Sequence, residues 1–212
     1  MNPIISNFEN IKSLINNSNV KIVAVSKTFS FDDIRPLVEY GHLHFGENKV
    51  QEAQSKWLNC KKDNPKLCLH MIGKLQSNKA KEAVKLFDYI HSLDNQKLAN
   101  ILAKQENITN KKLKYFIQVN IGNEKQKAGI GVNFLDDFFY YCVKELKLNV
   151  IGLMAIPPNN DNANDYFKKL TELNKLLGLK ELSMGMSSDF KIALNYETTF
   201  VRLGSSIFGK RG

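Results

Sequence analysis

The chain is poor in the features that mark secreted, membrane-spanning and zinc-binding proteins. It has three cysteines, Cys60, Cys68 and Cys142, which form no CxxC pair. This pattern argues against a disulfide framework or a zinc site and is typical of a reducing compartment. No apolar run reaches the roughly 18 residues of a membrane-spanning helix, and the N-terminus lacks the basic and apolar segments of a signal peptide. We therefore expect a cytoplasmic protein with no membrane partner, and we interpret the cysteines as packing residues.

Arginine is also scarce, although the chain is basic. The net charge is +9, yet only three of the 30 basic residues are arginines, namely Arg35, Arg202 and Arg211. The lysines are scattered along candidate helices, whereas proteins that read nucleic-acid bases favour arginine for its bidentate fork. We expect no specific nucleic-acid binding.

The sequence signatures of nucleotide and metal binding are missing. No GxGxxG or GxxxxGK[ST] pattern occurs, so the dinucleotide and P-loop hypotheses lack their defining turn. The four histidines, at positions 42, 44, 70 and 91, show no HExxH or related spacing. We predict that they are packed or hydrogen-bonded strand residues rather than metal ligands.

Short runs of branched apolar residues alternate with longer segments that have apolar residues at helical spacing. The expected strands span residues 20–28, 43–45, 67–72, 89–93, 114–120, 149–156, 182–185 and 200–203. The expected helices span residues 2–16, 31–41, 49–62, 77–87, 95–106, 133–146, 163–177 and 188–195. Eight such units without a proline- or glycine-rich linker favour a closed (β/α)8 TIM barrel over an open doubly wound sheet. We predict an α/β protein with a single domain over residues 1–212.

The first expected strand, VKIVAVSKT at residues 20–28, ends on Lys27. Its branched residues are typical of a strand buried on both faces of a parallel sheet. A lysine at the buried end of such a strand loses part of the solvation of its ammonium, which favours the neutral amine that attacks a carbonyl. Schiff-base chemistry is therefore one hypothesis for Lys27. The alternative is a solvated lysine that closes the strand.

Polar and glycine-rich turns follow several expected strands, at the end of a barrel where functional sites lie. The turns at residues 185–189 and 204–209 could each hold a phosphate, because glycine lets the backbone approach closely and a following helix directs N–H groups at an anion. The alternative for the first turn is a helix cap, with Ser187 or Ser188 as the capping residue and Asp189 in the first helical turn.

Six motifs follow one another along essentially the whole chain: AVSKT at 24–28, FGEN at 45–48, HMIGKLQSNK at 70–79, GLMAIP at 152–157, GMSSD at 185–189 and RLGSSIFG at 202–209. In these motifs the chain closely resembles the YggS/PROSC family of pyridoxal 5′-phosphate homeostasis proteins. The resemblance implies a single barrel like the N-terminal domain of alanine racemase, as in fold type III proteins. It also implies that pyridoxal phosphate is bound as a Schiff base on a lysine, which in this sequence is Lys27.

The resemblance implies roles for five further residues. Asn48 would lie near the cofactor ring, and Arg202 would face the pyridine nitrogen. Ser187, Gly204 and Ser205 would hold the phosphate, since serine hydroxyls and backbone amides donate well to phosphate oxygens. The family often has threonine where this chain has Ser205, so the hydroxyl is kept and a methyl group is lost.

Two further charged residues lie near the expected site. Lys127 matches another family lysine near the mouth of the barrel, and we rank it below Lys27 as the residue that carries the cofactor. Glu47, between two motif residues, is expected to be an ion-pair partner that orders its loop rather than a general base.

Two classes of function fit these residues. One is a carrier or regulator of pyridoxal phosphate, and the other is an amino-acid racemase, which needs a second acid–base group opposite the lysine. In the alanine racemase family that group is a tyrosine from a second, β-rich domain, for which this chain has no residues after Gly212. We therefore expect a non-catalytic, monomeric protein of vitamin B6 and amino and keto acid homeostasis, with no metal site. Its candidate partners are the apo-enzymes that receive the cofactor, and the racemase is the alternative.

Overall fold

The computed structural model describes residues 2–15, 17–124, 126–158 and 162–209, and these form a closed barrel of eight parallel strands. The order around the barrel is β1-β2-β3-β4-β5-β7-β8-β9, and β9 pairs again with β1. The strands are β1 (Lys21–Val25), β2 (His44–Glu47), β3 (Cys68–Met71), β4 (Tyr89–Leu93), β5 (Lys114–Asn120), β7 (Val150–Met154), β8 (Glu181–Met186) and β9 (Phe200–Leu203). The predicted (β/α)8 barrel and its eight strands are confirmed. A two-residue strand, β6 (Ile130–Gly131), pairs with the end of β5 and was not predicted.

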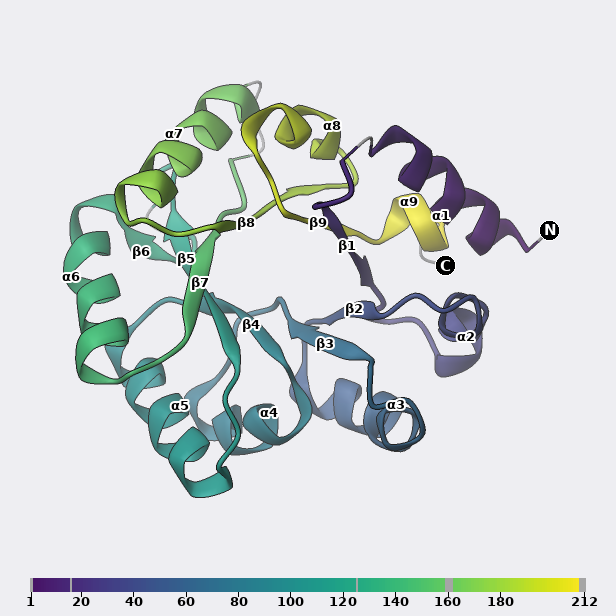
Figure 1. The fold of residues 1–212 in the computed structure, drawn as a ribbon, viewed down its shortest axis with the longest axis horizontal. Helices are drawn as coiled ribbons and strands as arrows, with labels where there is room; N and C mark the ends of the chain where they lie inside the picture. Colours follow the sequence, from purple (N-terminus) through teal and green to yellow (C-terminus); the bar gives the residue numbers. More distant parts are fainter. Residues whose placement is uncertain (1, 16, 125, 159–161, 210–212) are drawn as a thin grey trace.

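Helices surround the barrel on its outside (Figure 1). They are α1 (Pro3–Leu14), α2 (Phe31–Glu39), α3 (Val50–Asp63), α4 (Ala80–Leu86), α5 (Gln96–Thr109), α6 (Leu135–Tyr140), α7 (Ala163–Leu176), α8 (Phe190–Ala193) and α9 (Ser205–Phe208). The first eight correspond to the expected helices, although their bounds differ: most are shorter than expected, α3 is shifted by one residue, and α5 continues to Thr109 beyond the expected end at residue 106. The short α9 was not predicted. It packs against α1, where the Asn7 side-chain amide donates to the carbonyl oxygen of Ile207 at 3.1 Å. The first and last helices therefore lie side by side.

Local sequence explains where several helices begin. Ser30 and Asp33 form a capping box at the start of α2, in which the Asp33 amide donates to Ser30 Oγ at 3.2 Å and the Ser30 amide donates to Asp33 Oδ2 at 2.9 Å. Asn95 caps α5 by accepting from the Leu98 amide at 2.9 Å. Such caps satisfy backbone N–H groups that have no partner within the helix.

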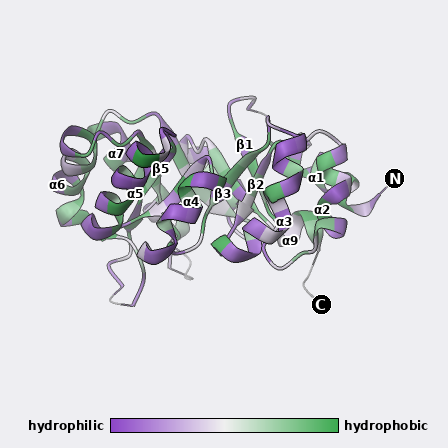
Figure 2. Cartoon of the chain, turned by 90° about the horizontal axis from the view of Figure 1, so that it is seen from below, coloured by the Kyte–Doolittle hydropathy of each residue, from purple (hydrophilic) through white to green (hydrophobic). Residues whose placement is uncertain are grey.

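Apolar residues fill two layers, one between strands and helices and one inside the barrel. Hydrophobic and hydrophilic residues alternate along the helices (Figure 2), as expected for helices with one buried face. Trp57 on α3 is fully buried against Phe45, with ring centroids 4.7 Å apart. The inner cluster consists of Val23, Tyr89, Phe116, Met154 and Phe200. No helix of the described residues is long and apolar enough to cross a membrane.

Close approach of β7 and β8 requires a glycine at position 152. A Cβ atom there would lie 1.9 Å from the carbonyl oxygen of Glu181, far inside van der Waals contact. Because the obstacle is backbone in a paired strand, it cannot turn aside as a flexible side chain would. Only glycine permits this pairing.

We predict that Gly152→Ala lowers the free energy of unfolding by about 3 kcal/mol or more, at the upper end of the cost of overpacking. The matched control is Gly131→Ala on β6, where the nearest atom to the new Cβ is Phe134 Cδ2 at 3.4 Å. Urea unfolding of both variants and the parent measures the effect. Equal stability of the two variants would contradict the steric argument.

Candidate functional site

A cavity of about 1000 Å³ opens at the carboxyl ends of the barrel strands. All six residues predicted for the cofactor site line it, namely Lys27, Asn48, Ser187, Arg202, Gly204 and Ser205. They come from four strand ends, those of β1, β2, β8 and β9, which neighbour one another in the barrel. The structure thus brings the six together at one place, while their individual roles remain predictions.

Lys27 lies in a tight turn directly after β1. The next residue, Thr28, has a φ of 70°, in the left-handed region that β-branched residues rarely occupy. Its amide donates to Glu52 Oε1 of α3 at 2.5 Å, and the amide of Ser26 donates to the Gly46 carbonyl oxygen at 3.0 Å. Surrounding contacts therefore hold the turn in a conformation that costs of order 1–3 kcal/mol.

A buried carboxylate lies behind this turn. Glu47 is fully buried at the end of β2, and its Oε1 accepts hydrogen bonds from Ser26 Oγ at 2.7 Å, Lys56 Nζ at 2.9 Å and Trp57 Nε1 at 2.8 Å. Lys56 Nζ also donates to the Ser26 carbonyl oxygen at 2.7 Å. The predicted ion-pair role of Glu47 is confirmed. Its partners tie α3 to the ends of β1 and β2, where Lys27 and Asn48 enter the cavity.

The turns after β8 and β9 lie against each other, at strand ends that neighbour β1 in the barrel. Ser187 Oγ is 3.1 Å from Ser206 Oγ and accepts from the Ser206 amide at 3.4 Å. Ser205 is the first residue of α9, where an amide has no acceptor within its own helix. Serine hydroxyls and backbone amides are therefore gathered here as hydrogen-bond donors.

The capping alternative for Ser187 and Ser188 is wrong. The residue before α8 is Asp189, whose Oδ1 accepts from the Met186 amide at 2.6 Å and so closes the turn itself. Gly185 precedes this turn with a φ of 93°, and a Cβ there would lie 2.9 Å from Ala193 Cβ. The turn is thus folded without the serine hydroxyls, because Asp189 and a glycine provide its closure.

Arg202 reaches the cavity from β9 and is only 4% exposed. Its Nη1 donates to Ser183 Oγ at 2.7 Å and its Nη2 to the Ala155 carbonyl oxygen at 3.0 Å. Burial lowers the pKa of Arg202 to about 10, partly offset by Asp189, so the side chain is a cation at neutral pH. A guanidinium has five N–H donors, which leaves donors for a group in the cavity.

Two further lysines line the cavity. Lys127 Nζ lies 2.6 Å from Glu124 Oε2 and donates to the Pro157 carbonyl oxygen at 3.2 Å. Lys74 is exposed. The geometry therefore does not by itself select one lysine, because Lys27 follows β1 and Lys74 follows β3.

The four histidines are hydrogen-bonded strand or loop residues, as predicted. His70 and His91 are fully buried inside the barrel, with Nδ1 of His70 2.9 Å from Nε2 of His91. Among the residues that the structure describes, no group of acidic, cysteine and histidine side chains could hold a metal ion.

Sequence reasoning missed several cavity-lining residues, including Phe29, Ile72, Gln118 and Met186. Each lies at or just after the carboxyl end of a barrel strand. Counting alternate residues back from the end of each expected strand would have found Ile72 and Gln118, because successive side chains of a strand point to opposite faces. Phe29 and Met186 lie beyond the expected strand ends and give no such signal.

The chain matches the family described as alanine racemase, N-terminal domain, over residues 1–212. It is 38% identical to the pyridoxal phosphate homeostasis protein of Aquifex aeolicus over 200 residues, which cover 90% of this chain and 87% of the relative. It is 37% identical to the protein of that name in Vibrio cholerae over 207 residues, with 92% and 86% covered.

Solved structures of similar proteins have the same fold. PipY of Synechococcus elongatus PCC7942 with PLP bound superimposes with a TM-score of 0.89 at 33% identity, covering 97% of this chain and 100% of PipY. Alanine racemase of Clostridium difficile 630 shares the fold, with a TM-score of 0.77 at 12% identity, and this chain covers 57% of it. The chain belongs to the alanine racemase N-terminal domain family and, within it, to the pyridoxal phosphate homeostasis proteins.

Proposed function

We propose that this chain binds pyridoxal 5′-phosphate in the cavity and acts in its homeostasis as a carrier or regulator, with Lys27 as the residue that bonds to it. The observation that carries the proposal is the convergence of an amine, a buried cation and a set of serine and amide donors on one cavity. The names of the relatives and the PLP-bound PipY structure support it.

The residues present fit the chemistry of this cofactor. Pyridoxal phosphate supplies an aldehyde that condenses with a primary amine, a ring nitrogen that accepts a hydrogen bond, and a phosphate. Ser187, Gly204 and Ser205 offer hydroxyl and amide donors to the phosphate, as the turns after barrel strands often do. Arg202 offers donors and a positive charge, and Lys27 offers the amine. Asn48 lines the same cavity from the end of β2, next to the strand of Lys27, and we assign it to contact with the cofactor ring.

Arg202 suits a carrier, although a racemase that limits side reactions could use the same residue. A guanidinium only donates, so a ring nitrogen that faces it accepts a hydrogen bond and carries no proton of its own. An unprotonated ring is a poor electron sink, whereas many enzymes of this cofactor keep the ring protonated with a carboxylate. The charge of Arg202 at neutral pH supports this assignment.

The second acid–base group of a racemase also has no evident candidate. The described residues that line the cavity include no tyrosine and no histidine, and Lys127 is engaged by Glu124. We therefore propose that the protein is non-catalytic. We further propose that it acts as a monomer and passes the cofactor to apo-enzymes.

We predict that borohydride reduction of the cofactor-loaded protein labels Lys27 and that Lys27→Ala abolishes the label. Peptide mapping by mass spectrometry identifies the modified residue. The matched control is Lys74→Ala, which removes another lysine of the same cavity and should leave the label in place. A label chiefly on Lys127 or Lys74 in the parent would overturn the assignment.

We predict that Ser187→Ala and Ser205→Ala each weaken the affinity for pyridoxal phosphate about tenfold, because each removes a hydrogen bond to a charged group worth about 1.5–3 kcal/mol. Equilibrium titration of the cofactor absorbance measures this. Ser55→Ala, on the exposed face of α3, is the control and should bind as the parent does. Parental affinity in both site variants would place the phosphate elsewhere.

The loaded protein is expected to form no D-amino acid from a panel of L-amino acids, since the cavity lacks an evident second acid–base group. Chiral chromatography of the reaction mixtures tests this, with free pyridoxal phosphate as the background. Formation of a D-amino acid that Lys27→Ala abolishes would establish the racemase instead.

A further inference from the structure

A row of hydrogen bonds runs through the inside of the barrel and ends on Arg202. His44 Nδ1 is 3.0 Å from His70 Nε2, His70 Nδ1 is 2.9 Å from His91 Nε2, and His91 Nδ1 is 2.8 Å from Ser183 Oγ. Ser183 Oγ in turn accepts from Arg202 Nη1 at 2.7 Å. We call these four residues (His44, His70, His91 and Ser183) the histidine row. It crosses the barrel from the start of β2 to the cavity.

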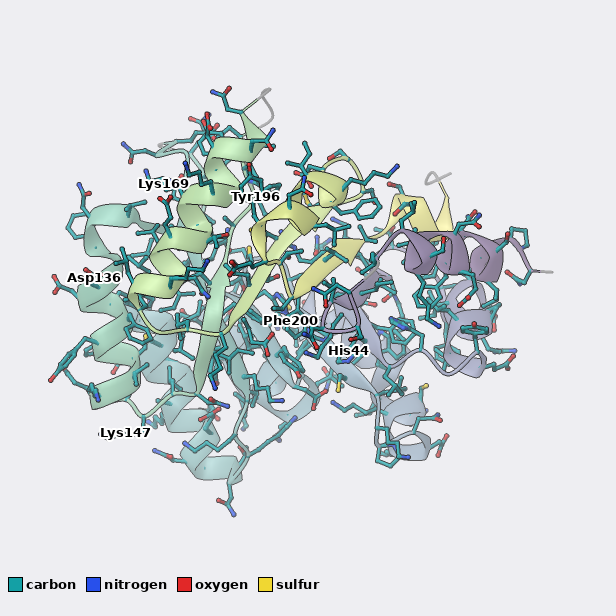
Figure 3. All side chains as sticks on the ribbon, turned by 45° about the horizontal axis from the view of Figure 1, so that its top comes forward. His44, Asp136, Lys147, Lys169, Tyr196 and Phe200 are labelled. Carbon is teal, nitrogen blue, oxygen red and sulfur yellow. The ribbon has the colours of Figure 1, made fainter. Side chains whose placement is uncertain are left out.

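Aromatic rings hold the planes of the two inner histidines. His70 stacks on Tyr89, with centroids 4.2 Å apart and planes 12° apart, and His91 stacks on Phe116 at 4.4 Å and 28°. At the other end, His44 lies 6.4 Å from Phe200 between ring centroids, and Figure 3 shows these two side chains together in the middle of the molecule. The rings are thus kept in position for hydrogen bonds along the row.

All three histidines of the row are neutral at physiological pH. Burial lowers the pKa of His70 and of His91 well below the ordinary value. Burial, aided by Lys21 and Lys114, lowers the pKa of His44 to about 4. A neutral imidazole has one donor nitrogen and one acceptor nitrogen, so the row must have a direction.

Arg202 determines that direction. Because a guanidinium has no acceptor, Ser183 Oγ accepts from Arg202, and its single proton is left for His91 Nδ1. His91 then carries its proton on Nε2 and donates to His70 Nδ1, and His70 donates through Nε2 to His44. In the opposite direction, Ser183 would accept from both neighbours, and its own buried proton would have no acceptor among the described residues. Such an unsatisfied group is unfavourable.

We propose that the histidine row is a set of positioning residues for Arg202: it fixes the plane of the guanidinium at the floor of the cavity, and Arg202 in return fixes the direction of the row. Within the proposed function, the row holds the donors of Arg202 towards the ring nitrogen of the cofactor. Ser183 and His91 would then affect cofactor binding without touching the cofactor. This second step rests on the proposed function, whereas the direction of the row does not.

The direction is tested in the ligand-free protein by ¹⁵N NMR of the histidine rings, whose shifts distinguish protonated from unprotonated nitrogens. The chain has only four histidines, so each signal can be assigned. We expect a proton on Nε2 and none on Nδ1 of His44, His70 and His91. A proton on Nδ1 of His70 or His91 in the parent protein would overturn the proposal.

Ser183→Ala separates the row from Arg202, and we expect His70 and His91 to become mixtures of both tautomers. Arg202→Lys keeps a donor-only cation and should keep the parental tautomers. His42 is an internal control, because its Nε2 lies 2.9 Å from the His44 carbonyl oxygen and is outside the row. Parental tautomers in Ser183→Ala would show that Arg202 does not set the direction.

The link to the cofactor is tested by titration with pyridoxal phosphate. Ser183→Ala should bind about tenfold more weakly than the parent, since Arg202 loses a hydrogen bond that orients it. Ser187→Ala should also bind more weakly but keep all parental tautomers, which separates positioning from direct contact. Equal affinity of Ser183→Ala and the parent would refute the positioning role. If the parent itself binds no pyridoxal phosphate, the proposed function fails, and the tautomers of the ligand-free protein still decide the direction of the row.

Discussion

The hydrogen bonds that join β1 to β9 and β4 to β5 close the sheet, and the site depends on this closure. Because every strand pair in the described barrel is parallel, the carboxyl ends of all eight strands meet at one rim. Residues as far apart in sequence as Lys27 and Arg202 thereby line one cavity. If the sheet were open between β4 and β5, or between β1 and β9, those two strands would lie at opposite edges. Their carboxyl ends would then not meet at a common rim.

Two buried charged groups, Glu47 and Arg202, lie on barrel strands near the cavity, and each has several hydrogen-bond partners. Glu47 accepts three hydrogen bonds behind the turn of Lys27, and Arg202 donates to Ser183 and to a carbonyl oxygen. Removing one partner of a buried ion pair typically costs about 3–5 kcal/mol, because an uncompensated charge remains. This cost applies to Glu47 and its ion-pair partner Lys56, whereas Arg202 is held by two neutral acceptors, Ser183 Oγ and the Ala155 carbonyl oxygen.

The inside of this barrel is unusually polar at its centre. Barrels of this kind are commonly filled by layers of branched apolar side chains. Here the histidine row replaces part of those layers, and aromatic residues such as Tyr89 and Phe116 pack against the rings. Buried polar groups are tolerated when each finds a partner, and the row satisfies this condition only in one direction. The direction of the hydrogen bonds inside the barrel therefore depends on Arg202, which can only donate.

The sequence by itself determined the alternation of strands and helices and the group of six residues around the cavity. These follow from local periodicity and from motifs, which report which residues face inward and where strands end. The tertiary structure decided that Asp189 closes the turn at Ser187, that β6 and α9 form, and that three histidines and a serine align. Members of the row are 26, 21 and 92 residues apart. Periodicity tells on which face of a strand a side chain lies, but the height at which it enters the barrel is set by strand register, which arises only when the sheet closes.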